Sequence, residues 1–193
     1  MERPRREIPI RTERCVLRSP RNSDYTAWAA LRQDSRTFLE PWEPQWPADA
    51  LSMDDWKRRM RAWREGWDID RSYVFLLFER ASATLLGGVS LSNVRRGPAQ
   101  TAAMGYWLGA PFEGHGFMRD AVNATCQWAS DGAGLARIEA ATVPENTRSQ
   151  GVLIDCGFER EGYARAYLEI AGVRRDHVLF ARTLAQDPVG RRR

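Results

Sequence analysis

The residues with the clearest chemical potential form a short glycine-containing run: Gly114, His115, Gly116, Phe117 and Met118. Glycine lets a backbone approach a ligand closely and adopt conformations that other residues avoid. If a helix begins near Gly116, the free N–H groups of its first turn, as far as Arg119, point at a bound anion, and the helix dipole favours negative charge there. Such a loop could hold a pyrophosphate without any lysine. Taken alone, the two glycines fit a plain tight turn equally well.

A dinucleotide-binding loop of the Rossmann type is the obvious competitor. Its fingerprint needs a third glycine, and position 119 is arginine instead. The fingerprint also opens a strand–helix–strand unit, whereas this run follows a series of strand patterns that predict an antiparallel meander. The Rossmann interpretation therefore fits poorly.

The elements that position this loop follow from periodicity and from cap residues. Strands are predicted over residues 15–18, 72–78, 85–91, 101–108, 137–142, 158–170 and 174–183. Helices are predicted over residues 22–34, 52–67, 116–130 and from 144 through 156. This order indicates an α/β (α+β) layer fold, with a central, mostly antiparallel mixed sheet of about 6–7 strands and about 4 flanking helices.

A segment rich in proline and tryptophan interrupts the pattern between the first two helices. Pro41, Pro44 and Pro47 exclude a regular helix or a central strand there. Trp42 and Trp46 make the segment too apolar for a flexible linker. We therefore expect residues 40–47 to fold over another part of the protein.

Length and composition predict one domain over residues 1–193, with a core of about 10–184. No apolar run is long enough for a membrane span, and no secretory signal is evident, so a cytoplasmic location is expected by default. Three widely spaced cysteines and two histidines give no metal-binding spacing, and we expect buried or neutral thiols and no metal site. The length and the composition are typical of a globular protein with a sizeable core.

The net charge of +4 is concentrated at the ends of the chain. Residues 1–21 carry seven arginines against three acidic residues, and residues 182–193 carry four against one. The middle is slightly acidic, so the body is not a basic nucleic-acid-binding surface. The basic termini either touch RNA, as in a weak rRNA or ribosome contact, or remain solvated tails.

Four motifs, taken in order, resemble those of one family. They are Gly105-Tyr106-Trp107-Leu108, Glu113-Gly114-His115-Gly116-Phe117-Met118, Asn146-Thr147-Arg148-Ser149 and Cys156-Gly157-Phe158-Glu159-Arg160-Glu161-Gly162. The chain resembles the GNAT acetyltransferases, and within them the RimJ/RimL-type ribosomal-protein-alanine N-acetyltransferases. The segment Glu40–Pro44, the run Tyr167–Ile170 and the pair Asp176-His177 resemble RimJ-type sequences too. The resemblance spans residues 10–184.

The resemblance implies acetyl-CoA as co-substrate, held mainly by backbone amides of the glycine run and of Arg119. The family's phosphate motif departs here at two positions, Glu113 and Met118, and we expect the Glu113 side chain to face solvent. Trp107 and Leu108 would lie where the strand splays from its neighbour and would supply oxyanion donors. Asn146 would hydrogen-bond the pantetheine arm.

The resemblance also bears on the proton donor. Where many GNAT enzymes carry a tyrosine, this chain has Leu153, which cannot donate a proton. In the RimJ/RimL branch a serine three residues after the asparagine is thought to serve instead, and Ser149 stands there. The alternative for Ser149 is a first-turn helix residue that bonds the backbone.

In this class of reaction a carboxylate is expected to accept the proton of the attacking ammonium through water. Glu43 is the candidate because it lies in the proline/tryptophan segment, and its alternative is a solvated surface residue. Trp42 and Trp46 either line an acceptor tunnel or cap the core, and Tyr167 could line the acceptor side. Tyr106 and Trp107 are typical core aromatics, and His177 is expected to be a structural strand residue.

The predicted activity is acetyl transfer to a primary amine, with the N-terminal alanine of a ribosomal protein as the expected acceptor. One alternative is a small-molecule N-acetyltransferase for a polyamine, aminoglycoside or amino acid, suggested by the acidic residues Glu40, Glu43, Asp49, Asp54 and Asp55. Another is a non-catalytic ribosome- or RNA-binding module. A monomer and a homodimer are both compatible with the sequence.

Overall fold

The computed structural model describes residues 9–184. Its strands are β1 Ile10–Arg11, β2 Cys15–Arg18, β3 Tyr73–Glu79, β4 Leu85–Arg95, β5 Thr101–Leu108, β6 Arg137–Thr142, β7 Glu159–Ile170 and β8 Val173–Thr183. Its α-helices are α1 Tyr25–Asp34, α2 Arg36–Leu39, α3 Met53–Asp68, α4 Phe117–Asp131 and α5 Thr147–Asp155. Short 3₁₀ turns cover Asn22–Asp24 (η1), Glu40–Trp42 (η2) and Ala110–Phe112 (η3).

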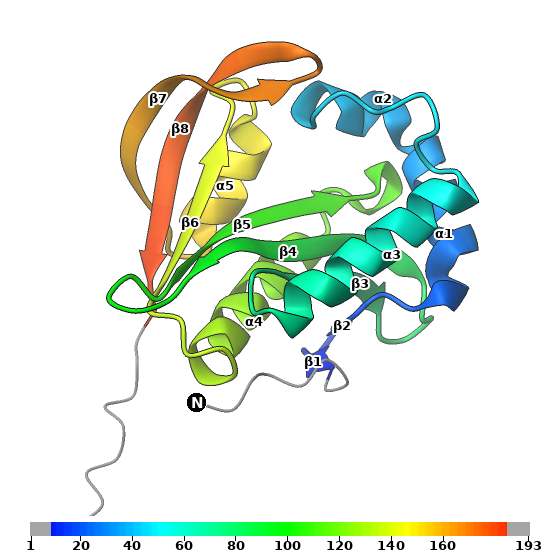
Figure 1. The fold of residues 1–193 in the computed structure, drawn as a ribbon, viewed down its shortest axis with the longest axis horizontal. Helices are drawn as coiled ribbons and strands as arrows, with labels where there is room; N and C mark the ends of the chain where they lie inside the picture. The colour runs from blue at the N-terminus through cyan, green and yellow to red at the C-terminus, as the bar shows by residue number, and fades with distance from the viewer. Residues whose placement is uncertain (1–8, 185–193) are drawn as a thin grey trace, which may run out of the picture.

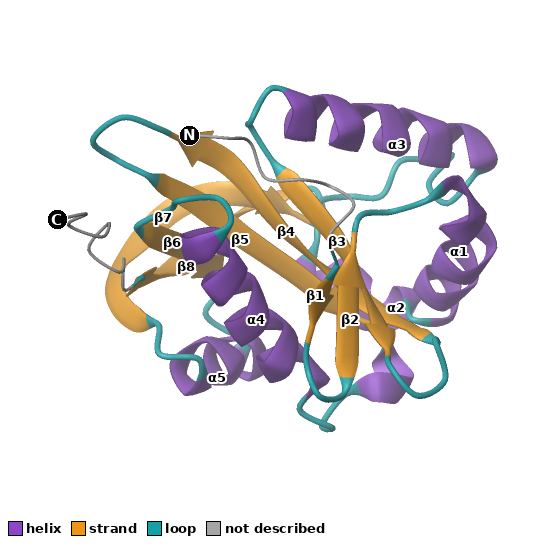
Figure 2. Cartoon of the chain, turned by 90° about the horizontal axis from the view of Figure 1, so that it is seen from below, coloured by secondary structure: helices purple, strands orange, loops and turns teal. Residues whose placement is uncertain are grey.

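The strands of the described residues form one sheet in the order β1-β2-β3-β4-β5-β6-β8-β7. Every pairing is antiparallel except that of β5 with β6. Helices α1 and α3 lie on one side of the sheet, and α4 and α5 lie on the other (Figure 2). This α+β arrangement confirms the predicted GNAT fold.

Two elements were not predicted, and both are short. The two-residue strand β1 brings the sheet to eight strands, against the expected 6–7. The single turn α2 brings the α-helices of the described residues to five, against the expected four. Elements of two and four residues are too short to show a strand or helix period, so the sequence pattern carries no signal for them.

Helix boundaries follow the local capping chemistry. Helix α3 begins after Ser52, whose hydroxyl accepts a hydrogen bond from the Asp55 amide at 3.1 Å. The side chain of Asn146 does the same for α5 by accepting from the Ser149 amide at 3.1 Å. Gly157, with φ +75°, ends the turn after α5. The Asn146 cap therefore sets the start of α5 and places Ser149 in its first turn.

The core lies on both faces of the sheet. The larger cluster packs α4 and α5 against the sheet, and it includes the fully buried residues Leu17, Leu91, Val122 and Leu153. A smaller cluster under α1 and α3 joins Trp28, Trp56, Met60, Leu76 and Leu85. No helix of the described residues is long and apolar enough to cross a membrane.

The sheet opens in its middle, between β5 and β6. The two strands pair only through Thr101–Ala103 and Arg137–Glu139. Beyond Ala103, β5 continues to Leu108 without a partner on this side, and the two strands diverge (Figure 1). The divergence confirms the predicted splay near Trp107 and Leu108, and it leaves backbone groups of β5 available to a ligand.

Candidate active site

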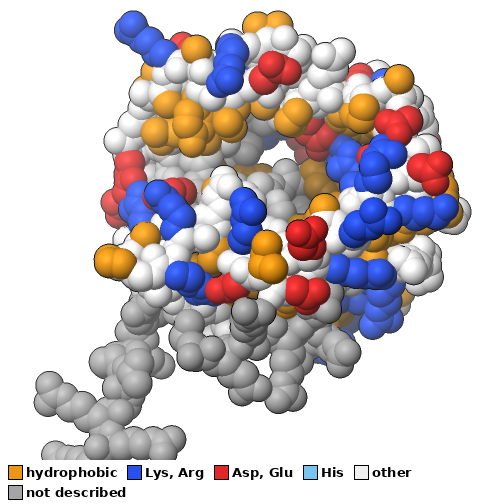
Figure 3. Space-filling view, viewed as in Figure 1, with side chains coloured by type: hydrophobic (Ala, Val, Ile, Leu, Met, Phe, Trp, Pro, Cys, Tyr) orange, Lys and Arg blue, Asp and Glu red, His pale blue; other side chains and the backbone are white. Residues whose placement is uncertain are grey.

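A cleft of about 900 Å³ runs through the opening between β5 and β6. Its walls come from β5, the glycine loop, the start of α5, the β7–β8 hairpin and the η2 segment. In Figure 3 it appears as a hollow near the centre of the molecule. Most of the predicted site residues line it: Trp42, Glu43, Trp107, Leu108, Gly114, Gly116, Met118, Arg119, Asn146, Ser149 and Tyr167.

The glycine loop has the conformation that an anion site needs. Gly114 and Gly116 both adopt left-handed backbone angles, with φ of +79° and +77°. Helix α4 starts directly after Gly116, and no side chain of the described residues caps it. Its first backbone N–H groups therefore remain available to a ligand in the cleft.

Arg14 supplies a positive charge at this loop that sequence reasoning missed. Its guanidinium donates to the His115 carbonyl oxygen at 2.9 Å and to the Asp120 carboxylate at 2.8 Å. It also lies 5.0 Å from the centre of the Phe117 ring. His115 and Phe117 do not line the cleft, but they hold Arg14 against the loop. Because Arg14 is a hundred residues away in sequence, no local pattern could have indicated it.

Glu113 forms an ion pair at the rim of the cleft. Its carboxylate lies 2.9 Å from a guanidinium nitrogen of Arg148, and its side chain is 38% exposed. The expectation that Glu113 simply faces solvent was therefore incomplete, because it also lines the cleft beside the loop. The neighbouring Arg148 offsets a charge that would otherwise repel a pyrophosphate.

Ser149 is held by an aromatic residue on the opposite wall. Its Oγ lies 2.8 Å from the phenolic oxygen of Tyr106, and the Tyr106 hydroxyl also donates to the Ser149 carbonyl oxygen at 3.0 Å. Burial raises the pKa of Tyr106 well above its ordinary value, although the hydrogen bond to Ser149 works in the opposite direction. Tyr106 therefore stays protonated and presents a hydroxyl, not a phenolate, to Ser149.

Asn146 is committed in part to the helix. Its side-chain oxygen caps α5, and its amide nitrogen remains as a donor for the predicted hydrogen bond to a ligand. Thr142, at the end of β6, also lines the cleft, and its buried Oγ1 has no hydrogen-bond partner among residues 9–184. An unpaired hydroxyl in a cleft is suited to a polar ligand, because a bound group can satisfy it.

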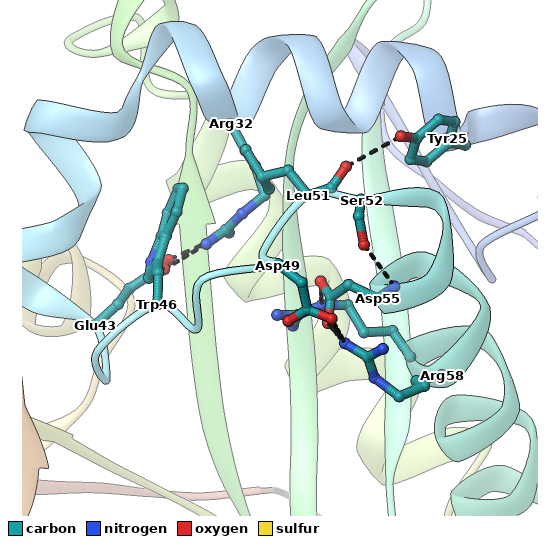
Figure 4. A network of polar contacts seen from close by, with 10 residues as sticks. Tyr25, Arg32, Glu43, Trp46, Asp49, Leu51, Ser52, Asp55 and Arg58 are labelled. Atoms are coloured by element: carbon teal, nitrogen blue, oxygen red, sulfur yellow. Dashed lines mark hydrogen bonds and ion pairs between the residues drawn. The ribbon is translucent and has the colours of Figure 1, made fainter.

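The acceptor side of the cleft contains a buried ion pair. Arg32 of α1 contacts both carboxylate oxygens of Glu43, and Trp46 donates its indole N–H to Glu43 at 2.8 Å (Figure 4). The guanidinium lies 4.6 Å from the ring centre of Trp46 and 4.9 Å from that of Trp107. Trp46 therefore covers Arg32 instead of lining the cleft.

The proline/tryptophan segment folds over the cleft, as expected, and meets the closing hairpin. The Ala171 amide, at the β7–β8 turn, donates to the Glu43 carbonyl oxygen at 2.9 Å. Trp42 and Tyr167 remain 38% and 46% exposed at the mouth. Figure 3 shows apolar side chains along the upper lip of the hollow, where Figure 1 places this hairpin. The mouth is therefore apolar on one side and closed by backbone on the other.

His177 also lines the cleft, which the sequence did not suggest. It lies on β8, as predicted, and is only 2% exposed. Its ring makes an edge contact with Tyr167, with ring centres 5.6 Å apart. An imidazole inside a cleft that already contains Ser149 and Glu43 adds a third group capable of proton transfer.

Comparison with known proteins is consistent with this geometry. Residues 14–159 match the Acetyltransferase (GNAT) domain family. The chain is 33% identical over 185 residues to the [Ribosomal protein uS5]-alanine N-acetyltransferase of Escherichia coli (strain K12), covering 96% of this chain and 95% of that protein.

Two solved structures are similar over most of the chain. One is the ribosomal-protein-S5-alanine acetyltransferase of Vibrio fischeri, with a TM-score of 0.85, 32% identity and coverage of 95% and 99% of the two chains. The other is Mycobacterium smegmatis RimJ in complex with CoA-disulfide, with a TM-score of 0.85, 32% identity and coverage of 90% and 84%. The chain therefore belongs to the GNAT family and is an N-acetyltransferase of RimJ-like sequence and fold.

Proposed function

We propose that this enzyme transfers an acetyl group from acetyl-CoA to the N-terminal α-amine of a ribosomal protein, with alanine as the first residue. The observation that carries the proposal is the cleft itself, which joins an anion-binding glycine loop at one end to a partly closed acceptor mouth at the other. The similarity to uS5-alanine N-acetyltransferases supports the choice of acceptor.

The residues present suit coenzyme A. The first-turn amides of α4, with Arg119 lining the cleft beside them and Arg14 held against the loop by Asp120 and the His115 carbonyl, match a pyrophosphate. The unpaired edge of β5 and the free hydroxyl of Thr142 offer hydrogen bonds to an amide-containing arm that runs through the splay. When bound, acetyl-CoA supplies the acetyl group as a thioester. Backbone N–H groups at Trp107 and Leu108 would stabilise the oxyanion that develops on its carbonyl.

Ser149 is the proposed donor to the departing sulfur. Tyr106 can give its hydroxyl proton to the Ser149 carbonyl oxygen or to Oγ. In the second arrangement the Ser149 proton is free to point into the cleft. Tyr106 thus fixes Oγ in position and lets it donate, which a serine bonded only to the helix backbone could not do.

The acidic residues that suggested a polycationic small-molecule acceptor do not gather in the cleft. Of the five acidic residues that suggested it, only Glu43 lines the cleft. Glu40, Asp49, Asp54 and Asp55 each form an ion pair with a basic residue of their own region, and Glu43 pairs with Arg32. Their charges are therefore locally neutralised and do not form an acidic acceptor surface.

Release of free CoA with a panel of acceptors tests the proposal. The panel contains peptides that begin with alanine, the same peptides with a blocked N-terminus, lysine-containing peptides with blocked termini, and small polyamines. We expect release with the free alanine terminus and little with its blocked form. Release only with polyamines, or none with any amine, would contradict the proposal, and the second result would favour a non-catalytic binding module.

Mass spectrometry of ribosomal proteins from a deletion strain identifies the natural acceptor. The expected result is one ribosomal protein whose N-terminal acetyl group disappears. The proposed weak contact of the basic termini with rRNA concerns residues that lie largely outside 9–184, and removal of residues 1–8 and 185–193 would test it by RNA binding.

A further inference from the structure

The attacking amine must lose a proton, and Glu43 is poorly disposed to take it. Both of its carboxylate oxygens already accept hydrogen bonds, from Arg32 and from the Trp46 indole. The Arg32 side chain is only 10% exposed. Protonation of Glu43 would therefore leave a buried guanidinium without its counter-ion, which is costly. This arrangement suits a structural clamp better than a base.

His177 occupies a different and better position in the cleft. The register of β8 pairs Val178 with Thr142, the last residue of β6. His177 precedes Val178 on β8, and because the two strands are antiparallel it lies beside the point where the chain leaves β6 for Asn146 and Ser149. Its ring faces the cleft together with that of Tyr167 on β7. The imidazole thus lies on the wall of the cleft that β7 and β8 form, close to the carboxyl end of β6.

The hydrogen bonds of His177 determine which nitrogen carries its proton. Nδ1 lies 3.0 Å from the Arg175 carbonyl oxygen. A carbonyl oxygen can only accept, so Nδ1 must be the protonated nitrogen of the neutral ring. Nε2 then carries a lone pair, and the hydrogen bond that the ring makes among residues 9–184 is the one at Nδ1. The ring is therefore oriented by its own strand and has a basic nitrogen free.

The charged groups around His177 are engaged elsewhere. On β8, the Asp176 carboxylate accepts from the Ala166 amide and the Tyr163 hydroxyl, each at 2.8 Å. Arg175 pairs with Glu145 of the β6–α5 loop at 3.0 Å. From β7, Tyr167 presents a ring edge, and from the η2 segment Glu43 is bound to Arg32. Among the described residues, none of these side chains forms a hydrogen bond with Nε2.

We propose that His177 is the general base of the acetyl transfer, an assignment that rests on the proposed function. Nε2 accepts a proton from the acceptor ammonium, directly or through one water, and the neutral amine nitrogen forms its bond to the thioester carbonyl carbon. The carbon–sulfur bond breaks, and the sulfur leaves with its electron pair toward the hydroxyl of Ser149. The Ser149 hydroxyl protonates that sulfur, and the second amine proton restores the serine hydroxyl, so that free CoA leaves as the thiol. The proton carried by His177 returns to solvent.

His177→Asn is the decisive variant. The asparagine amide can keep the donor to the Arg175 carbonyl oxygen while it removes the basic Nε2. With an alanine-terminal peptide at pH 7, we expect kcat/KM to fall by about 10²-fold or more, as for loss of a general base. Above pH 8 the defect should shrink, because the free α-amine, with a pKa of about 8, is then largely neutral without help.

A second acceptor separates proton transfer from simple packing. An aminooxyacetyl peptide has a terminal nitrogen that is unprotonated at pH 7, so it needs no base before attack. With it, His177→Asn should lose less than about tenfold in kcat/KM, because only the positioning part of the role is affected. Equal losses with both acceptors, or no loss with either, would overturn the assignment.

Glu43→Gln is the matched comparison, since it removes the other candidate base and keeps the side-chain volume. We expect its losses to be similar for the two acceptors. A loss confined to the alanine peptide would transfer the role to Glu43 and overturn the proposal. Unchanged acetyl-CoA affinity checks that each variant is folded, and His177→Gln substitutes if the asparagine variant fails this check.

Wild-type turnover on the alanine peptide comes first and tests the proposed function separately. If the wild-type enzyme prefers another primary amine, the same comparison applies to that amine and to its aminooxy analogue. A wrong acceptor and a wrong base therefore give different results.

Discussion

At the scale of single residues, the site depends on pairs that reach across the cleft. Ser149 sits on the first turn of α5, yet its hydroxyl contacts Tyr106 of β5 rather than its own helix. The contact of the Tyr106 hydroxyl with Ser149 Oγ, at 2.8 Å, holds the serine rotamer, which matters because a proton donor misplaced by about 1 Å can lose 10²-fold in rate. The pair therefore acts as a unit in which Tyr106 positions and Ser149 donates.

Ser149→Ala should lower kcat by about 10²-fold and leave the affinity for acetyl-CoA nearly unchanged, because the donor acts on the leaving group. Tyr106→Phe should lower kcat by about tenfold, since Ser149 remains but loses its fixed orientation. Steady-state kinetics together with direct measurement of acetyl-CoA binding separate the two effects.

Tyr25→Phe is the matched control for the tyrosine. The Tyr25 hydroxyl also donates to a backbone carbonyl, that of Leu51 at 3.1 Å, but it lies outside the cleft (Figure 4). Its kcat should stay at the wild-type value. Unchanged turnover in Ser149→Ala would remove the serine from the mechanism.

At the scale of elements, the glycine loop and α4 form one unit whose geometry depends on two left-handed residues. An added Cβ at Gly114 would meet no atom within 4 Å, whereas at Gly116 it would lie 3.2 Å from the guanidinium of Arg14. Substitution by alanine would thus strain the backbone at both positions, but only at Gly116 would the new Cβ also press against Arg14. This difference makes the two glycines a natural matched pair.

Gly114→Ala and Gly116→Ala should each destabilise the fold by about 1–2 kcal/mol, the cost of a left-handed conformation in a residue with a Cβ. Only Gly116→Ala should also displace Arg14 and so raise the Kd for coenzyme A, by about tenfold more than its partner substitution. Chemical denaturation and calorimetric titration measure the two effects independently. Equal Kd values in the two variants would show that Arg14 does not contribute to binding.

At the scale of the whole molecule, the sequence predicted the periodic helices and strands but not the contacts between segments that lie far apart in the chain. Strands and helices with a period of two or 3.6 residues, and caps such as Ser52 and Asn146, were visible because the signal lies within one segment. The motif resemblance located the glycine loop and Ser149. Contacts such as Arg14 with His115, and Arg32 with the ring of Trp107, join distant segments and have no signature in spacing.

The role of His177 shows the same limit. In sequence it is one residue of a strand, and an imidazole in a strand is usually structural. Its place in the cleft follows from the pairing of β8 with β6 and from the splay of β5, which only the assembled sheet defines. A single sequence therefore carries least information about site residues, such as His177, that reach the cleft only through the pairing of strands.

The three cysteines report on the stability of the whole sheet. All are free and buried, as predicted, and desolvation raises the pKa of Cys126 and Cys156 to about 11, from an ordinary value of 9.0. At pH 8 the thiolate that reacts with alkylating reagents is therefore scarce in the folded protein, in addition to being inaccessible. Labelling of the native protein at pH 8 should be at least about 10²-fold slower than labelling in denaturant, as measured by intact mass spectrometry.

The same shift makes stability fall at alkaline pH. The pKa of each thiol is higher in the folded than in the unfolded protein. Below pH 9 the thiols are protonated in both states and do not change the free energy of unfolding. As the pH rises from 9 toward 11 they ionise first in the unfolded state, which lowers the free energy of unfolding. The melting temperature should decline across this range, and less steeply in Cys126→Ala than in the wild-type protein. Equal slopes in the two proteins, or rapid labelling at pH 8 without denaturant, would mean that the packing of α4 against the sheet opens far more readily than its burial indicates.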